Sequence, residues 1–98
     1  MKIKKSETEI MVFAIYWLHG KTYFYGLSKG YEGLLAYDAS EVEVLEPELG
    51  SDYMYMDDGV FYKPLIEENI LDELVEADPS AYQRFLEILR AAGSINEV

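Results

Sequence analysis

The chain has 98 residues, no cysteine and a formal net charge of −11 at pH 7. At this length residues 1–98 are expected to form a single domain, since domains usually run to about 100–150 residues. The lack of Cys excludes a disulfide framework, a thiolate nucleophile and a Cys-based zinc site. Half of the residues are hydrophobic, so the chain is too apolar to be intrinsically disordered.

The charge is unevenly distributed along the chain. Residues 1–30 carry five Lys and two Glu, whereas residues 31–98 carry 17 Asp and Glu against three Lys and Arg. This excess of acid argues against direct nucleic-acid binding, where Lys and Arg supply the affinity, and against binding to anionic membranes. A basic protein is the predicted partner, because opposite charge speeds association.

The N-terminal segment has part of the pattern of a secretory signal. Residues 1–5 are basic, but Glu7 and Glu9 separate them from the apolar run Ile10–Leu18. That run has nine residues, far fewer than the about 20 that a membrane-spanning helix needs. We therefore expect a cytoplasmic protein without a signal or a membrane segment.

Residues up to 66 have the composition of strands and turns. They include 11 of the 13 Tyr and Phe, the only Trp and six of the seven Gly. The predicted strands in this part are Ile10–Leu18, Lys21–Leu27 after a His19-Gly20 turn, Leu34–Tyr37, Glu41–Glu46, Tyr53–Met56 and Val60–Lys63. Ile10–Leu18 is apolar on both faces, which predicts a central strand or one covered on both sides.

The last predicted hairpin turns at Asp57-Asp58-Gly59, because Asp-Gly between two β-rich runs is a strong hairpin signal. Pro64 suits the end of its second strand, since proline cannot donate to a strand ladder. A first helix is predicted over Glu67–Ala77 from its apolar stripe.

A second predicted helix begins at Asp78, an N-cap residue followed by Pro79 at the first helical position. It ends near Ala92, with Gly93 as the stop signal. The expected fold is α+β, with a strand-rich part over residues 9–66 and a helical part over residues 67–93. Its mostly antiparallel sheet of five or six strands either closes into a small SH3-like barrel or stays open with the two C-terminal helices covering one face.

The chemical motifs in the sequence are weak. Tyr55-Met56-Asp57-Asp58 matches the four-residue catalytic signature of reverse transcriptases, but a small acidic domain lacks the third carboxylate and the basic template surface. His19, the only histidine, falls in a predicted turn exposed to solvent. No catalytic residue, cofactor or metal site is predicted, since Asp52, Asp57 and Asp58 lack the spacing of a dedicated calcium loop.

The combination of tyrosine and acid is the most informative feature. Tyr53 and Tyr55 lie on one face of their strand, and this face looks outward if Met54 and Met56 face the core. Exposed Tyr provides rigid amphipathic contact area. The predicted partner-binding residues are Glu41, Glu43, Tyr53, Tyr55, Asp57, Asp58 and Tyr62.

The predicted function is a non-enzymatic protein-binding module that binds a basic partner. Small size, acidity and the lack of Cys are the general character of inhibitor, immunity and antirestriction proteins, an analogy of composition alone. One alternative is a structural homo-oligomer, such as a homodimer, or a subunit of a larger assembly, because the doubly apolar Ile10–Leu18 could need a neighbouring chain. Another is a small-molecule-binding domain with a pocket between sheet and helices.

Overall fold

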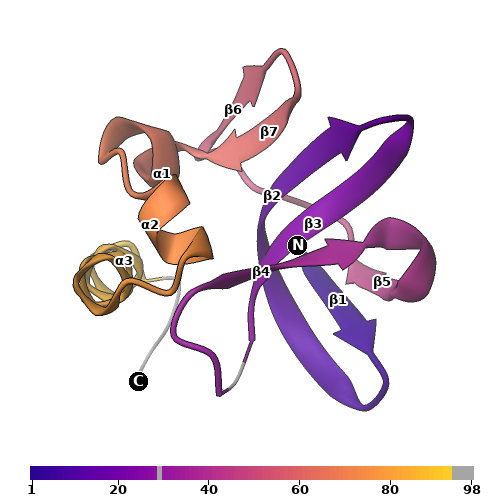
Figure 1. Ribbon diagram of the computed structural model, residues 1–98, viewed down its shortest axis with the longest axis horizontal. Coiled ribbons are helices and arrows are strands. Elements are labelled where there is room, and N and C mark those ends of the chain that lie inside the picture. Colours follow the sequence, from indigo (N-terminus) through magenta and orange to yellow (C-terminus); the bar gives the residue numbers. More distant parts are fainter. Residues whose placement is uncertain (29, 94–98) are drawn as a thin grey trace.

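The computed structural model describes residues 1–28 and 30–93, and these form a seven-stranded antiparallel sheet followed by three α-helices (Figure 1). The α+β prediction is confirmed. The strands are β1 (Lys2–Lys5), β2 (Thr8–Leu18), β3 (Lys21–Leu27), β4 (Leu34–Asp38), β5 (Glu43–Glu46), β6 (Tyr53–Met56) and β7 (Gly59–Tyr62). The helices are α1 (Lys63–Glu67), α2 (Leu71–Val75) and α3 (Pro79–Ala91), and a 3₁₀ turn, η1, covers Ala39–Glu41.

The first four strands form a meander, and β5 returns to pair with β1, so the strand order is β4-β3-β2-β1-β5. The short η1 turn and Val42 link the two edge strands β4 and β5, which requires a strongly curled sheet. These two strands do not pair with each other, so the sheet is not closed. The barrel alternative is therefore wrong, and the open alternative is correct.

Strand β2 organises the sheet because three strands pair with it. One edge of β2 pairs with β3 from Met11 to Leu18. The other edge is shared, since β1 pairs with Thr8–Met11 and β7 pairs with Ala14–Tyr16. The register with β3 shifts at Phe13, which marks a β-bulge. The β1–β5 arm and the β6–β7 arm therefore diverge from β2 beside Phe13.

Two hydrophobic clusters cover the two faces of β2. One consists of Ile3, Ile10, Val12, Phe24 and Tyr37, which come from β1 to β4. The other lies under the helices and consists of Phe13, Leu34, Tyr62, Leu65, Leu74, Ala81, Phe85 and Leu89. The prediction of a strand that is central or covered on both sides is confirmed from Ile10 to Ala14, where the chain itself supplies the cover. Figure 1 shows the helices together on one side of the sheet and β5 on the opposite side.

The first strand was not predicted, because residues 2–5 contain three Lys. In the structure their side chains alternate, with Ile3 fully buried between Ile10 and Val44 on the neighbouring strands. The surrounding Lys2 and Lys4 stay partly exposed. Strand pairing on both edges thus holds this charged segment in the sheet.

The helical region differs from the prediction in its first half. A single helix over Glu67–Ala77 is wrong, because Asn69 adopts a φ of 57° and separates the one-turn helices α1 and α2. Pro64 lies in the first turn of α1 rather than at the end of a strand, a position where its missing N–H costs no helical hydrogen bond. Ala77, with a φ of 61°, follows α2.

The last helix is confirmed at both ends. The Asp78 carboxylate accepts a hydrogen bond of 2.8 Å from the backbone N–H of Ser80, which makes Asp78 the N-cap of α3. Gly93 follows α3 with a φ of 73°, the left-handed conformation that stops many helices. In the part of the chain that the structure describes, no helix combines the length and the apolar character needed to cross a membrane.

Candidate protein-binding surface

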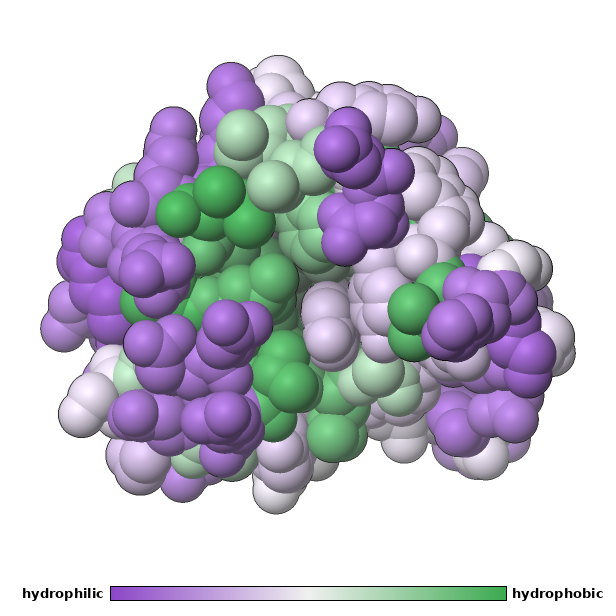
Figure 2. Space-filling view, turned by 45° about the horizontal axis from the view of Figure 1, so that its top comes forward, coloured by the Kyte–Doolittle hydropathy of each residue, from purple (hydrophilic) through white to green (hydrophobic). Residues whose placement is uncertain are grey.

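Large exposed hydrophobic side chains gather at two hairpin tips. Four of the five in the described residues lie there: Trp17 and Leu18 at the end of β2, and Tyr55 and Met56 at the end of β6. We call these four residues the hairpin patch. Figure 2, in which the top of Figure 1 comes forward, shows strongly hydrophobic residues gathered at the left and centre of this face, with strongly hydrophilic ones beside them; Trp and Tyr have pale colours on its hydropathy scale.

Backbone contacts hold the two tips together. The Trp17 N–H donates a 2.9 Å hydrogen bond to the carbonyl of Asp58, in the turn of the other hairpin. Gly59 permits this approach, because a Cβ at that position would lie 2.3 Å from the Ile15 carbonyl oxygen. The relative placement of the tips is therefore fixed by β-sheet hydrogen bonding.

The β2–β3 turn uses a backbone conformation that suits a tight hairpin. His19 and Gly20 have φ values of 53° and 78°, and two positive φ values in a two-residue turn match the right-handed twist of the strands. The predicted turn is confirmed. His19 is exposed at its tip.

The hairpin patch extends over both faces of the sheet. Directly paired residues of antiparallel strands share a face, so the pairing of Met56 with Gly59 and of Gly59 with Tyr16 places Met56 and Tyr16 on one face. Leu18 shares this face, two residues beyond Tyr16. The Trp17 and Tyr55 rings lie together on the other face, with centroids 6.3 Å apart. A partner can therefore contact the tips from either side and along the edge of β6.

A stack of tyrosine rings supports one side of the patch. Tyr16 stacks between Tyr23 and Tyr25, with centroid distances of 5.2 and 4.8 Å. Burial, and then the neighbouring Tyr25, raise the pKa of Tyr16 to about 12. Its phenol is neutral at physiological pH, so this part of the surface adds aromatic area without charge.

Acidic side chains border the hairpin patch. Asp57 and Asp58 form the β6–β7 turn, and Asp52 precedes β6; all three are exposed. The described residues contain no ion pair to any of them. Lys21, beside the neighbouring β2–β3 turn, lies 3.8 Å from Asp38 instead. The β6–β7 tip therefore carries uncompensated negative charge.

The structure separates the predicted partner-binding residues into two groups. Tyr55, Asp57 and Asp58 lie together on the exposed hairpin tip, and the side chain of Tyr55 is 79% exposed. Tyr62 is only 5% exposed, and Tyr53 is half-buried. The expectation that the face of Tyr53 and Tyr55 looks outward therefore holds for Tyr55 and only partly for Tyr53, and Tyr62 is buried.

Packing against the helices explains the position of Tyr62. Its ring lies 5.6 Å from that of Phe13 and 6.4 Å from that of Phe85 on α3. The Tyr53 ring packs beside it, with the centroids of the Tyr53 and Tyr62 rings 5.4 Å apart. The methionine face is more exposed than expected, since Met56 belongs to the hairpin patch.

The other two predicted residues lie on a different arm of the sheet. Glu41 is in η1, with its carboxylate 3.6 Å from the Lys5 ammonium. Glu43 is exposed on β5, which pairs with β1. The structure does not bring these two glutamates to the hairpin patch.

Sequence reasoning missed Trp17 and Leu18 as surface residues. Their strand is apolar on both faces along its whole length, so the sequence does not show at which residue other elements stop packing against it. The available signal was their position directly before the His19-Gly20 turn, because the tip of a hairpin projects beyond the elements that pack on its base.

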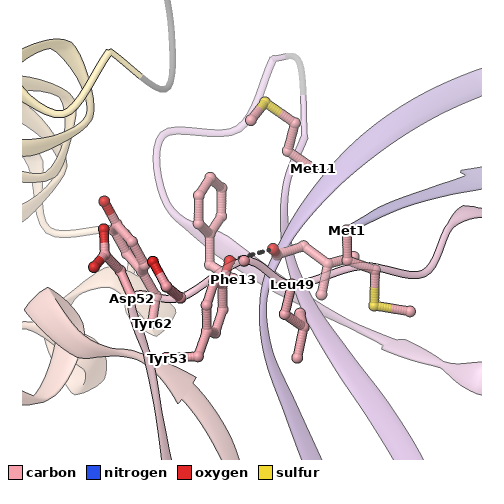
Figure 3. Close-up of a pocket in the computed structure, with 10 residues that line it drawn as sticks. Met1, Met11, Phe13, Leu49, Asp52, Tyr53 and Tyr62 are labelled. Atoms are coloured by element: carbon pink, nitrogen blue, oxygen red, sulfur yellow. Dashed lines mark hydrogen bonds between the residues drawn. The ribbon is translucent and has the colours of Figure 1, made fainter.

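A pocket of about 320 Å³ lies where the two arms diverge from β2 (Figure 3). It is lined by Met1, Met11, Val12, Phe13, Leu49, Gly50, Ser51, Asp52, Tyr53 and Tyr62. The Tyr53 hydroxyl donates a 3.2 Å hydrogen bond to the Val12 carbonyl across its floor. Burial raises the pKa of Tyr53 to about 12, so this phenol is neutral at physiological pH.

A second pocket, of about 430 Å³, lies between α1 and the end of α3, and Pro64, Arg84 and Ile88 are among its lining residues. Arg84 lies between Glu68 and Glu87, at 3.0 and 3.4 Å, and the hydrogen bond that its guanidinium donates to Glu68 raises the pKa of Arg84. Within residues 1–28 and 30–93, no group of three or more His, Asp or Glu side chains is arranged to hold a metal ion.

The surface thus combines an aromatic and apolar patch, a rigid backbone frame and a border of free carboxylates. These are features of a binding surface. In comparisons with known proteins, no family model, no curated protein and no solved structure matches the chain.

Proposed function

We propose that the protein is a non-enzymatic binding module that holds a basic protein partner against the hairpin patch. The supporting observation is the clustering of four large exposed hydrophobic residues at two hydrogen-bonded hairpin tips. A small soluble domain gains nothing in stability from such exposure. Contiguous apolar surface of this kind is typical of interaction sites.

The residue types suit a compact interface. Trp and Tyr are enriched among the residues that carry most of the binding energy at interfaces. Trp17 and Tyr55 are held by strand pairing, so little conformational entropy is lost when a partner covers them. They would form the centre of the contact.

The surrounding carboxylates would select the partner. Asp57 and Asp58 are free of ion pairs within the described residues, so they can engage Lys or Arg of another chain without first breaking an internal contact. Such charges mainly raise the association rate and reject acidic partners. An inhibitor, immunity or antirestriction role follows from this chemistry, with carboxylates occupying sites where the partner otherwise binds phosphate.

Affinity capture with matched variants tests the proposal. The bait is the wild-type protein, the double variant Asp57→Lys/Asp58→Lys, or the control Glu32→Lys/Glu76→Lys, which changes the net charge equally at exposed positions outside the hairpin. Capture is performed from native cells at low salt and at about 1 M salt, where the Debye length is about 3 Å. Retained proteins are identified by mass spectrometry.

A basic protein should be retained by the wild type and the control, weakened by salt and lost from the hairpin variant. Retention by all three baits, or of acidic proteins only, would contradict the proposal. The control is essential because any acidic protein attracts cations through its net charge.

The other two functions stay predictions. The homo-oligomer was suggested by the doubly apolar β2, whose faces from Ile10 to Ala14 are now accounted for by the two internal clusters. Only Trp17 and Leu18 remain as exposed apolar residues of that strand. Light scattering at high protein concentration tests self-association, and a ligand co-purifying in either pocket would support a small-molecule-binding domain.

A further inference from the structure

We infer that the partner contributes an extended, basic segment that pairs with the free edge of β6 as an additional strand. This inference rests on the proposed function, and it specifies how the partner is held. In this binding mode, backbone hydrogen bonds supply affinity and alternate side chains supply specificity.

The orientation of the backbone groups of β6 follows from its pairing. Lys63 N–H donates a 2.8 Å hydrogen bond to the Asp52 carbonyl, and alternate residues of an antiparallel strand bond to the same neighbour. Met54 and Met56, in register with Phe61 and Gly59, therefore face β7. The N–H and C=O groups of Tyr53 and Tyr55 point to the other side, where no strand pairs with β6 in the described chain.

The backbone hydrogen-bonding groups of β7 alternate between its two edges in the same way. The carbonyl of Asp58 points away from β6 and accepts the hydrogen bond from Trp17 of β2. β7 is thus bonded on both edges, whereas β6 is bonded on one. The outward groups of Tyr55 lie beside an exposed side chain and are open to a partner.

β6 also differs from the other edge strands in its sequence. Natural proteins protect edge strands with charged residues, proline or very short length. β5 carries Glu43 and Glu46, and β4 ends at Asp38 and buries Leu34 and Tyr37. β6 reads Tyr-Met-Tyr-Met, with no charge and no proline. β6 is as short as β5, but it is the edge strand whose own residues include no charge and no proline.

The charges at the two ends of β6 identify the kind of strand that fits. Asp52 precedes the strand, and Asp57 and Asp58 follow it. A second copy of β6 pairing antiparallel would place carboxylates against carboxylates at both ends, which disfavours self-pairing. A strand with Lys or Arg at both ends would place opposite charges there. Alternating β-branched or aromatic residues between them would contact Tyr55 and Trp17.

Selection from a random dodecapeptide phage library provides the test. The immobilised protein is the wild type, Tyr55→Pro or Tyr55→Thr. Proline removes the outward N–H but no bond to β7, whereas threonine keeps the N–H and a strand-forming side chain while removing the ring. Circular dichroism establishes that both variants are folded.

Peptides enriched on the wild type should carry Lys or Arg on both sides of a short alternating apolar segment. They should bind Tyr55→Pro about tenfold or more weakly than Tyr55→Thr. The lost hydrogen bond and the blocked strand edge together should cost more than about 1.4 kcal/mol of binding free energy, which corresponds to a tenfold change in affinity. Amide hydrogen exchange gives a second readout that needs no variant. Adding a selected peptide should slow exchange at Tyr55 but leave exchange at Met54, already bonded to β7, nearly unchanged.

Two results would separate this inference from the proposed function. Basic peptides that bind both Tyr55 variants equally and require Asp57 and Asp58 would overturn strand addition while supporting a basic partner. Peptides without basic residues, or no enrichment over a blank surface, would contradict both.

Discussion

The Trp17 and Tyr55 rings come from different hairpins and lie 6.3 Å apart at an angle of 34°. Since Trp17 is the only tryptophan, its fluorescence reports directly on the hairpin patch. The ring of Tyr55 also lies outside the core, so a variant that lacks this ring tests binding separately from folding.

Tyr55→Ala should weaken binding of a selected peptide or partner by tenfold or more, because an aromatic residue at the centre of an interface carries a large share of the binding energy. Its free energy of unfolding should stay within about 0.5 kcal/mol of the wild type, as is usual for exposed positions. Fluorescence titration and urea unfolding measure the two quantities. A large loss of stability with unchanged affinity would mean that Tyr55 has a structural role.

Gly59→Ala should separate the two hairpin tips. The new Cβ would lie 2.3 Å from the Ile15 carbonyl oxygen and 2.9 Å from the Tyr16 Cα, so β7 must move away from β2. We expect a loss of about 1–3 kcal/mol in unfolding free energy, typical of forced overpacking, and a change in Trp17 emission. Gly93→Ala, which strains the end of α3 instead, is the control and should leave the emission unchanged. Equal emission in both variants would contradict the proposed contact between the tips.

Tyr53→Phe should change the alkaline stability of the protein. Burial raises the pKa of Tyr53 from 10.0 to about 12. Between these values the unfolded chain releases the proton while the folded protein retains it, so the stabilising contribution present below pH 10 is lost as the pH rises towards 12. The variant should be about 0.5–1.5 kcal/mol less stable at pH 7, because its hydrogen bond to Val12 is lost.

The difference between wild type and Tyr53→Phe should then shrink from pH 10 to pH 12 in urea titrations. Tyr55→Phe, which removes an exposed hydroxyl, is the matched control at pH 7 and should cost less than about 0.5 kcal/mol. A constant difference between Tyr53→Phe and wild type across this range would show that the hydroxyl is not buried.

Phe85→Ala should severely destabilise the fold. Phe85 is fully buried on α3, and its ring meets Phe13 edge-on at 5.1 Å. A Phe-to-Ala change in a core costs about 3–5 kcal/mol, a large share of the 5–15 kcal/mol typical of a domain. Gln83→Ala, on the exposed side of the same helix, is the control. A cost below about 1 kcal/mol for Phe85→Ala in urea unfolding would show that α3 is not packed on the sheet.

Features with local causes could be predicted from the sequence. The hairpin at residues 53–62 follows from two β-rich runs and a turn, and α3 follows from the Asp78-Pro79 start and the Gly93 stop. In each case the decisive residues are neighbours along the chain. The break at Asn69 could not be predicted, because apolar periodicity continues through it and Leu65 and Leu74 both reach the same cluster.

The direction of the tyrosines depends on distant residues. Both faces of Tyr-Met-Tyr-Met are apolar, so alternation alone does not identify the buried face. Phe13 and Phe85 decide it by packing against Tyr62, and both are remote from β6 in sequence. Of the predicted partner-binding residues, Tyr55, Asp57 and Asp58 are exposed and Tyr62 is buried, and their role in binding stays a prediction.

The sharing of one β2 edge by two arms has a consequence for the order in which the protein folds. Strands β1 to β4 are consecutive neighbours within residues 2–38, so their pairings close only short loops. β7 must reach Ala14–Tyr16 from far along the chain, at a higher entropic cost. We expect the meander to form early during synthesis and the β6–β7 hairpin to dock late. The free edge of β6 would then reach its binding orientation only after β7 has paired with β2.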